Sequence, residues 1–321
     1  MKSDKIRIGL WGVGRHAERR LLPAIRGCKH ATLSSVHTRD IKIGDQISEK
    51  FGCVYHSDVS EFLEDPNTDA VIICTPTGAH QSHALQALSS GKHILVEKPL
   101  THSGKATVEL YSLARQKNLI AMEGLMYLFH PQFQGLINAV KSSSLGSIRS
   151  VSIKFGLPGV IANTFRAQRK LGGGATLDML CYPLSLGYQI CTTPPILVAS
   201  GVIETQPSDI DSGGWCILRS GNLLIDAHWG TELAYKNELS IWGANLSLHC
   251  PRVFTKEPNY KSKIQFFDPS GAKEKTLKTG SADSYSLMID KFAADIGNGF
   301  RDLEAEKASI WCAEMTSVIM G

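Results

Sequence analysis

The feature that most restricts how this chain can fold lies near its start, where a short β-rich run leads directly into a glycine-rich turn. The run Ile6–Trp11 is followed by residues 12–17, which read Gly-Val-Gly-Arg-His-Ala, and then by a helical pattern of apolar residues at Leu21, Leu22 and Ile25. A strand, a Gly-x-Gly-x-x-Ala turn and a helix in this order are typical of the first βα unit of a doubly wound parallel sheet.

The same turn is a candidate dinucleotide-binding site. Gly12 permits a tight turn, Gly14 leaves room for a pyrophosphate, and the N-terminus of the following helix faces the negative charge. A purely structural turn is the alternative interpretation. The residues that we expect to contact the cofactor here are Trp11, Gly12, Val13, Gly14, Arg15 and His16.

The end of the second predicted strand, Ala31–Val36, is where such a site selects its cofactor. An acidic residue there would bind the ribose 2′-hydroxyl of NAD, whereas a hydroxyl with a guanidinium can hold the additional phosphate of NADP. The chain has Thr38 and Arg39 at this point, so we expect NADP(H) to be preferred over NAD(H). Two alternatives stay open: Asp40, one position later, could take the acidic role, and Arg39 could be a solvated loop residue.

Alternating strands and helices continue to about residue 122. Elements of this length in alternation predict a doubly wound parallel sheet, here an N-terminal Rossmann domain of residues 1–122. The predicted elements are a helix near Ser57–Leu63, a strand Ala70–Cys74, a helix Ala79–Ser89, a strand Ile94–Val96, a helix Lys105–Gln116 and a strand Leu119–Met122.

Two of these strands end in residues suited to binding at the carboxyl edge of the sheet, where ligands of open α/β sheets lie. Thr75-Pro76-Thr77 forms a rigid turn after one strand, and His80 begins the next helix. Ordinary turn and helix-start chemistry would also explain these four residues. Their common position at the crevice makes them candidate cofactor contacts.

The second of the two strands ends in Glu97-Lys98-Pro99. Ile94–Val96 is a continuous apolar run, as expected of a strand buried on both faces, and Pro99 cannot donate a further ladder bond. Glu97 and Lys98 are therefore expected at the mouth of the crevice as cofactor contacts. Taken alone, the residue favours an ordinary surface lysine at position 98.

Composition excludes several functional classes. The chain has 321 residues, 43% hydrophobic and 20% charged, which is enough for two domains with separate cores. A net charge of +4 without a basic block argues against nucleic acid and against an anionic membrane surface as partners. No run approaches the ~18 apolar residues of a membrane span.

The eight cysteines are scattered, without a Cys-x-x-Cys pair, so we expect reduced core thiols and no metal site. The N-terminal residues lead straight into a strand, without an apolar signal region. We therefore expect a cytoplasmic protein.

Beyond Glu123 the pattern becomes β-rich, and residues 123–321 are predicted to form an α+β domain with an open, mainly antiparallel sheet. Such a sheet cannot leave a largely apolar face in water, so we expect it to join subunits in a homo-oligomer, a dimer or a tetramer. The predicted strands are Ile148–Phe155, Leu197–Glu204, Trp215–Arg219, Leu223–Trp229, Glu238–Trp242 and Ile264–Phe267.

One segment of this second half is helical rather than sheet-like. Three glycines at residues 172–174 allow a helix to begin flush against a ligand or another backbone, and the helix carries Asp178 and Tyr182 four residues apart on one face. Pro183 is expected to kink the helix just past the tyrosine. Spacing alone does not distinguish a functional pair from a first-turn acid and a buried aromatic residue.

These motifs together resemble the glucose–fructose oxidoreductase / inositol dehydrogenase / MocA (Gfo/Idh/MocA) family of NAD(P)-dependent oxidoreductases. The resemblance rests on the Gly-x-Gly-x-x-Ala turn, on Glu97-Lys98-Pro99, and on the three glycines followed by Asp178 and Tyr182, and it covers essentially the whole chain. Residues 122–132, Tyr182 in place of the histidine of many members, and residues 252–255 with Tyr260 are most similar to bacterial nucleotide-sugar 3-ketoreductases of deoxysugar biosynthesis. The chain departs from many members at Leu180, where they have glycine, and at Leu128, where they have arginine.

The resemblance implies hydride transfer between NADPH and a sugar carbonyl or hydroxyl. It makes Lys98 the catalytic lysine and Tyr182 the proton donor, acting from opposite domains, with Asp178 of the same motif in the catalytic set. Lys98 and Tyr182 would also contact the substrate, a sugar or nucleotide-linked sugar. Arg166 and Tyr260 are further candidate substrate contacts, although each could equally be an ordinary surface arginine or loop tyrosine that binds no ligand.

Three functions from different classes stay open. The first is an NADPH-dependent 3-ketoreductase of a nucleotide-linked deoxysugar, and the second is a dehydrogenase of a free sugar, cyclitol or dihydrodiol. The third is a non-catalytic NADP(H)-binding sensor, against which Lys98 and Tyr182 argue, because a sensor needs no proton donor beside the nicotinamide.

Overall fold

The computed structural model describes residues 5–159, 164–204 and 209–321. The chain forms two compact units, one comprising Met1–Met126 with Tyr285–Ile310 and the other Tyr127–Ser284 with Trp311–Gly321. The sequence pattern predicts the division at residue 122, with all residues after it in the second domain. It does not anticipate that residues 285–310 return to the first unit, because a helical pattern does not state which sheet the helix packs against.

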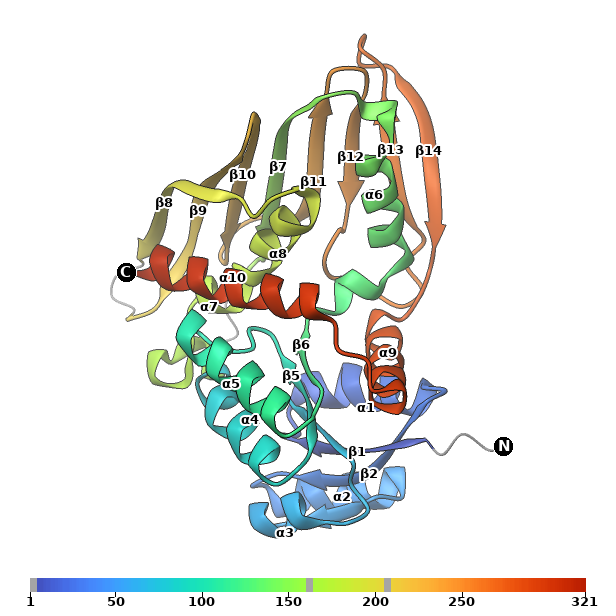
Figure 1. Cartoon of the computed structure of the whole chain (residues 1–321), viewed down its shortest axis with the longest axis vertical. Helices are drawn as coiled ribbons and strands as arrows, with labels where there is room; N and C mark the ends of the chain where they lie inside the picture. The colour runs from blue at the N-terminus through green and yellow to red at the C-terminus, as the bar shows by residue number, and fades with distance from the viewer. Residues whose placement is uncertain (1–4, 160–163, 205–208) are drawn as a thin grey trace. The chain divides into compact units, whose positions relative to one another are not determined.

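The first unit is built on a six-stranded parallel sheet in the order β3-β2-β1-β4-β5-β6. Figure 1 labels β1, β2, β5 and β6 of this sheet. The chain order reverses between β1 and β4, and the crevice at such a switch point is where dinucleotides bind. The strands are β1 Ile6–Trp11, β2 Ala31–His37, β3 Val54–His56, β4 Ala70–Ile73, β5 His93–Glu97 and β6 Ala121–Gly124; the helices are α1 Leu22–Gly27, α2 Ile41–Phe51, α3 Val59–Glu64, α4 His80–Ser89, α5 Gly104–Gln116 and α9 Ser284–Asn298.

The doubly wound sheet of the prediction is confirmed, and within residues 5–122 one α-helix and one strand are not among the predicted elements. One is helix α2, which is capped at its N-terminus by Asp40, whose carboxylate accepts from the backbone N–H of Ile43, and at its C-terminus by Gly52 in a left-handed conformation. The other is the three-residue strand β3. All four residues of β4 are buried, as expected of a strand covered on both faces.

The second unit contains an eight-stranded sheet in the order β14-β13-β12-β11-β7-β10-β9-β8. Its pairings are antiparallel except for β7 with β10, so the predicted open, mainly antiparallel sheet is confirmed. Its strands are β7 Ile148–Gly156, β8 Ile196–Glu204, β9 Asp211–Ser220, β10 Leu223–Gly230, β11 Lys236–Gly243, β12 Ser247–Pro251, β13 Ser262–Phe267 and β14 Lys273–Gly280; the helices are α6 Pro131–Lys141, α7 Ala175–Met179 and α8 Cys181–Ile190, and α10 Leu303–Met320 belongs to this unit from Trp311 onward.

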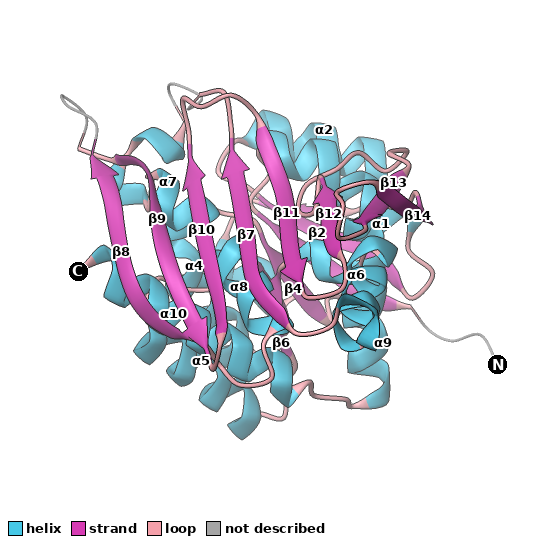
Figure 2. Ribbon diagram, turned by 90° about the horizontal axis from the view of Figure 1, so that it is seen from above, coloured by secondary structure: helices cyan, strands magenta, loops and turns pink. Residues whose placement is uncertain are grey.

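One face of this sheet is not covered by helices of the described part of the second unit, as Figure 2 shows for β8 to β11. The sequence analysis expects that face to be largely apolar, and this expectation is wrong. Trp242 on β11 is 68% exposed, and Leu224 on β10 and Val198 on β8 are also exposed, but Ser152 on β7 and Asp226 on β10 hydrogen-bond to one another. The alternation of strand residues buries the apolar set on the other face and leaves a mixed set outside.

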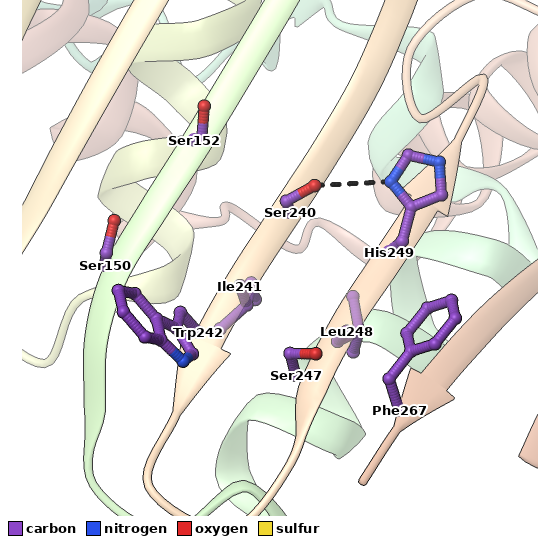
Figure 3. Close-up of a pocket in the computed structure, with 9 residues that line it drawn as sticks. All are labelled: Ser150, Ser152, Ser240, Ile241, Trp242, Ser247, Leu248, His249 and Phe267. Carbon is purple, nitrogen blue, oxygen red and sulfur yellow. Dashed lines mark hydrogen bonds between the residues drawn. The ribbon is translucent and has the colours of Figure 1, made fainter. Parts of the chain in front are cut away.

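The uncovered face is hollowed over β7, β11, β12 and β13. The hollow has a volume of about 390 Å³, and within it the side chains of Ser240 and His249 are hydrogen-bonded at 3.3 Å (Figure 3). Its lining residues are Ser150, Ser152, Ser240, Ile241, Trp242, Ser247, Leu248, His249 and Phe267.

Candidate active site

The glycine-rich turn after β1 has the geometry of a phosphate cradle. Gly12 has φ +95°, its N–H donates to His37 O at 2.9 Å, and a Cβ there would lie 2.8 Å from Cys74 O. A Cβ at Gly14 would meet no protein atom within 4 Å. The fold therefore requires glycine at position 12, whereas at position 14 glycine leaves open space that a pyrophosphate fits.

The predicted cofactor contacts around this turn divide into two kinds. The side chains of Trp11 and Val13 are buried, and Trp11 stacks on His83 at 4.1 Å, so only their backbone is suited to face a ligand. Burial lowers the pKa of His83 to about 4, with smaller contributions from nearby positive charges. Arg15 is exposed in the first helical turn, and His16 is only partly buried there. These two side chains remain candidates for direct contact.

The residues after β2 are arranged as the NADP interpretation requires. Thr38 is buried, and its backbone oxygen accepts from the Tyr55 hydroxyl at 3.1 Å, which fixes the turn. The Asp40 carboxylate is used to cap α2, accepting from Ile43 N at 3.2 Å. Arg39 and Asp40 are both exposed, but the Asp40 carboxylate already has this structural role, which leaves Arg39 as the candidate contact for a 2′-phosphate.

Two histidines of the following helix α4 form hydrogen bonds with the turn after β4. The hydroxyl of Thr75 is 3.0 Å from His83 Nδ1, and Pro76 leads into a short 3₁₀ turn that begins at the buried Thr77. His80 is 2% exposed, and its Nε2 and Nδ1 lie 3.0 Å from Thr75 O and 2.8 Å from Pro99 O. The structure thus places this predicted cofactor contact against the protein backbone.

Strand β5 ends at Glu97, and Lys98 follows it as a half-buried residue before a cis peptide bond to Pro99. Glu97 Oε1 is 3.3 Å from His16 Nε2 in the glycine-rich turn. Burial acts to raise the pKa of Glu97, but the bond to His16 and the positive charges of His16, Lys98 and His80 outweigh it and hold the pKa below its usual value. A carboxylate therefore sits beside the lysine.

A second acid near this lysine, Glu123 on β6, does not appear in the predicted site. It accepts hydrogen bonds from Leu100 N at 3.0 Å and from the Ser309 hydroxyl at 2.6 Å. Burial raises the pKa of Glu123, against these two bonds and the charge of Lys98. The sequence offers one signal, an acid at the end of a predicted strand, but its proximity to Lys98 follows only when β6 is known to pair with β5.

In the second unit the helix that carries Tyr182 is interrupted. Helix α7 ends at Met179 and α8 begins at Cys181, so the break falls at Leu180, before the tyrosine and not after it as predicted. Pro183 occupies the first turn of α8, where no intrahelical N–H is required, and the missing bond to the Met179 carbonyl ends α7 instead.

Tyr182 lies in an aromatic cluster. It is 4% exposed, and its ring centre is 5.1 Å from that of Phe155, 5.2 Å from Phe254 and 6.0 Å from Tyr127. Phe254 is held in turn by its backbone N–H, which donates to the buried Asn237 side chain at 2.9 Å. Packing on several sides fixes the ring, so this tyrosine is a buried residue with a defined orientation.

The other predicted residues of this unit are also paired. Arg166 Nε donates to Asp178 Oδ2 at 2.9 Å, which joins a predicted substrate contact to a predicted catalytic acid. The guanidinium of Arg252 lies over the Tyr260 ring, 4.9 Å from its centre. These pairs orient the side chains, and sequence spacing does not reveal either of them.

Three findings describe the chain further. Within residues 5–159, 164–204 and 209–321, no cluster of three or more His, Cys, Asp or Glu side chains is arranged to hold a metal ion. No helix among them is long and apolar enough to cross a membrane. All eight cysteines are free thiols, and most of them are buried.

Comparison with known families agrees with this geometry. Residues 6–125 match the oxidoreductase family with an NAD-binding Rossmann fold, and residues 133–249 match the GFO/IDH/MocA C-terminal domain. The chain belongs to the Gfo/Idh/MocA family. It is accordingly an oxidoreductase, as the motifs of the two halves predict.

Individual members of the Gfo/Idh/MocA family resemble the chain over most of its length. A dTDP-3,4-didehydro-2,6-dideoxy-α-D-glucose 3-reductase from Saccharopolyspora spinosa is 29% identical, covering 92% of this chain and 88% of its own. A D-xylose 1-dehydrogenase (NADP⁺) from Haloferax volcanii is 28% identical, with 91% and 89% coverage. The crystal structure of a 3-ketoreductase from Actinomadura kijaniata with NADP and TDP-benzene superposes with a TM-score of 0.94, at 27% identity and with 99% and 97% coverage.

Proposed function

We propose that the protein is an NADP(H)-dependent 3-ketoreductase of a nucleotide-linked deoxysugar, with Lys98 and Tyr182 as its catalytic residues. One observation carries the proposal. Solved variants of the Actinomadura kijaniata 3-ketoreductase replace one lysine and one tyrosine, and these are as far apart in that chain as Lys98 and Tyr182 are in this one. Both residue types are retained here in the same order.

The residues of the first unit fit the cofactor. Open space at Gly14 and the helix N-terminus after it suit a pyrophosphate, and Thr38 with Arg39 suits a 2′-phosphate. When bound, the nicotinamide supplies or accepts the hydride. The chain's own contribution is to orient that cofactor and to manage the proton and the charge on the substrate oxygen.

Tyr182 and Lys98 have different tasks in this proposal. A phenol, with an ordinary pKa near ~10, carries its proton at neutral pH and can donate it to the oxygen of the ketone as that oxygen becomes an alkoxide. The Lys98 ammonium stabilises the negative charge that develops on the same oxygen. Arg166, held by Asp178, and Tyr260, held by Arg252, are proposed to bind the remainder of the substrate.

A second candidate function is a dehydrogenase that oxidises a free sugar, cyclitol or dihydrodiol with the same residues. The likeness to the Haloferax volcanii xylose dehydrogenase favours it, because that relative covers nearly the whole chain at almost the same identity. A sensor that binds NADP(H) without turnover is the remaining alternative. Location in the cytoplasm stays a prediction.

The three functions separate in one set of assays. Purified protein should oxidise NADPH in the presence of a dTDP-linked 3-keto-2,6-dideoxy sugar, and should act far more slowly on the same sugar without the nucleotide. Reduction of NADP⁺ by xylose or a cyclitol, with no activity on the nucleotide-linked ketone, would support the dehydrogenase. Tight NADPH binding without turnover of any of these compounds would support the sensor.

We also propose that the uncovered face of the second sheet binds a second copy of the chain. Trp242, 68% exposed, lies beside serines, and Asp226 and Lys154 bring opposite charges to the same face. A face of mixed charge with exposed apolar side chains can be complementary to itself across a two-fold axis, the commonest symmetry of soluble oligomers.

Replacing Trp242 by glutamate should therefore lower the molar mass in solution from dimer to monomer, because two buried carboxylates would face each other or the same partner surface. Light scattering at micromolar concentration measures this. Val108→Glu, which places the same charge on an exposed apolar position of α5, is the control and should leave the mass unchanged. A wild-type monomer, or a variant that remains dimeric, would contradict the proposed interface.

A further inference from the structure

A single peptide group next to Lys98 is held from both sides by ionisable side chains. The carbonyl oxygen of Pro99 lies 2.8 Å from Nδ1 of His80, and the N–H of Leu100 donates to Oε1 of Glu123 at 3.0 Å. These two groups belong to the same peptide bond. His80 and Glu123 therefore hydrogen-bond to opposite ends of one amide in the turn that follows Lys98.

Each of the two side chains is anchored in turn. His80 Nε2 lies 3.0 Å from Thr75 O at the end of β4, and Glu123 Oε2 accepts from the Ser309 hydroxyl of α10 at 2.6 Å. His80 is almost completely buried. The arrangement thus ties the turn after β5 to the neighbouring strands β4 and β6 and to the C-terminal helix.

The protonation of His80 matters to this arrangement. A backbone carbonyl only accepts hydrogen bonds, so both bonds of His80 exist together only when both ring nitrogens carry hydrogen, as in the imidazolium. The Glu123 carboxylate at the N–H end matches the direction of the peptide dipole, and a hydrogen bond to an ionised group is the stronger kind. The neutral imidazole could keep only one of the two bonds.

We propose that His80 and Glu123 are positioning residues that fix the Lys98–Pro99–Leu100 turn and thereby the ammonium of Lys98. The inference rests on the catalytic role of Lys98 in the proposed function. Neither side chain is assigned a contact with substrate. The turn cannot hold the lysine by strand pairing alone, because Pro99 ends the ladder after β5.

Several charged and titratable groups near His80 affect its pKa. Burial lowers the pKa of His80, the charge of Lys98 adds to this effect, and the bonds to Pro99 and Thr75 with the charge of Glu97 oppose it. His83 on the same helix and His16 beside Glu97 are the other titratable neighbours. Because the pKa of His80 lies below its usual value of 6.5, the ring is neutral at neutral pH and keeps one of its two anchoring bonds, and the second bond requires protonation at lower pH.

Kinetics give the first test. Glu123→Ala and His80→Asn should lower kcat roughly 10- to 100-fold with little change in NADPH affinity, because a displaced catalytic group costs rate. Glu123→Gln keeps an acceptor for Leu100 and should recover part of the loss. In a Lys98→Ala background, the same substitutions should lower kcat almost no further, since their effect is exerted through the lysine.

The control is Glu306→Gln on α10. Glu306 is a buried acid that forms ion pairs with Arg115 and Arg301, so its loss affects stability without acting on Lys98. Full additivity of Glu123→Ala with Lys98→Ala would overturn the proposal. If Glu123→Ala does not fold, Ser309→Ala can replace it, because it removes the hydrogen bond from Ser309 to Glu123. Its smaller loss of kcat should likewise disappear in the Lys98→Ala background.

A second readout does not depend on the substrate. Labelling of Lys98 by acetic anhydride over a pH range, followed by peptide mass spectrometry, reports the titration of its amine. Glu123→Gln should move the labelling curve to lower pH, because a carboxylate that favours the ammonium has been removed, and Glu306→Gln should not. Identical curves would overturn the proposal. If Lys98→Ala and wild type are equally inactive on the keto sugar, the proposed function fails, and the labelling alone decides on His80 and Glu123.

Discussion

Tyr182→Phe should lose most of the turnover, roughly 10²- to 10⁴-fold, while NADPH binds as it does to the wild type. The substitution removes only a hydroxyl that is needed as the ketone oxygen takes up its proton, and general acid catalysis contributes an effect of this order. The phenylalanine ring fits the same aromatic cluster of Phe155, Phe254 and Tyr127, so the fold should be retained. Steady-state rates on the nucleotide-linked 3-keto sugar, with NADPH dissociation constants, measure both quantities.

Lys98→Ala should also lose turnover, and it should weaken substrate binding, because the ammonium interacts with the substrate oxygen before as well as during the reaction. If the two residues act as a unit, the double variant should be little worse than the poorer single variant. The matched control for Tyr182→Phe is Tyr188→Phe, since Tyr188 lies on the same helix, α8, and packs against Trp311.

Near-normal turnover in Tyr182→Phe would leave the phenol without its assigned role and would point to water or to Lys98 as the proton donor. If the fold-loss of turnover in the double variant equals the product of the two single fold-losses, the residues act independently.

NADPH should bind much more tightly than NADH, and Arg39→Ala should remove most of the difference. Loss of a charge-assisted contact to the 2′-phosphate costs about 1.5–3 kcal/mol, or roughly one to two decades in affinity. Titration of both cofactors against wild type and variant measures the preference.

Lys42→Ala is the control for this comparison, because it removes an exposed positive charge of α2 close in sequence to Arg39 without removing the predicted phosphate contact. Equal affinity of the wild type for the two cofactors would refute the NADP interpretation. An Arg39→Ala variant that still strongly prefers NADPH would assign the selection to other residues.

Local patterns are sufficient to predict much of the first unit. The strand before Gly12, the helix after it and the apolar run before Glu97 are each contained in a few consecutive residues, and the backbone rules that produce them act over that range. Gly12 is a clear case, because its left-handed φ and the nearby Cys74 carbonyl exclude any side chain. The position of Thr38-Arg39 is likewise predictable, since it follows directly from the end of a strand.

The second unit is predicted less completely, because its strands pair across long stretches of sequence. Strands β12 and β14 are absent from the prediction, and the uncovered sheet face is mixed where an apolar face is expected. Exposure on one face depends on which strands become neighbours, and a single strand's alternation does not contain that information.

The sequence by itself therefore determined the class of each half and the glycine-rich turn, because these depend on local backbone preference and on residue type. The roles proposed for Lys98 and Tyr182 came from the resemblance of their motifs to a known family. The pairing of Arg166 with Asp178 and the contacts of His80 and Glu123 with the peptide after Pro99 were decided only by the tertiary structure. Glu123 is 23 residues from Leu100 and 186 from Ser309. Hydrogen bonds between groups so far apart form only after β5, β6 and α10 have packed, so no local pattern specifies them.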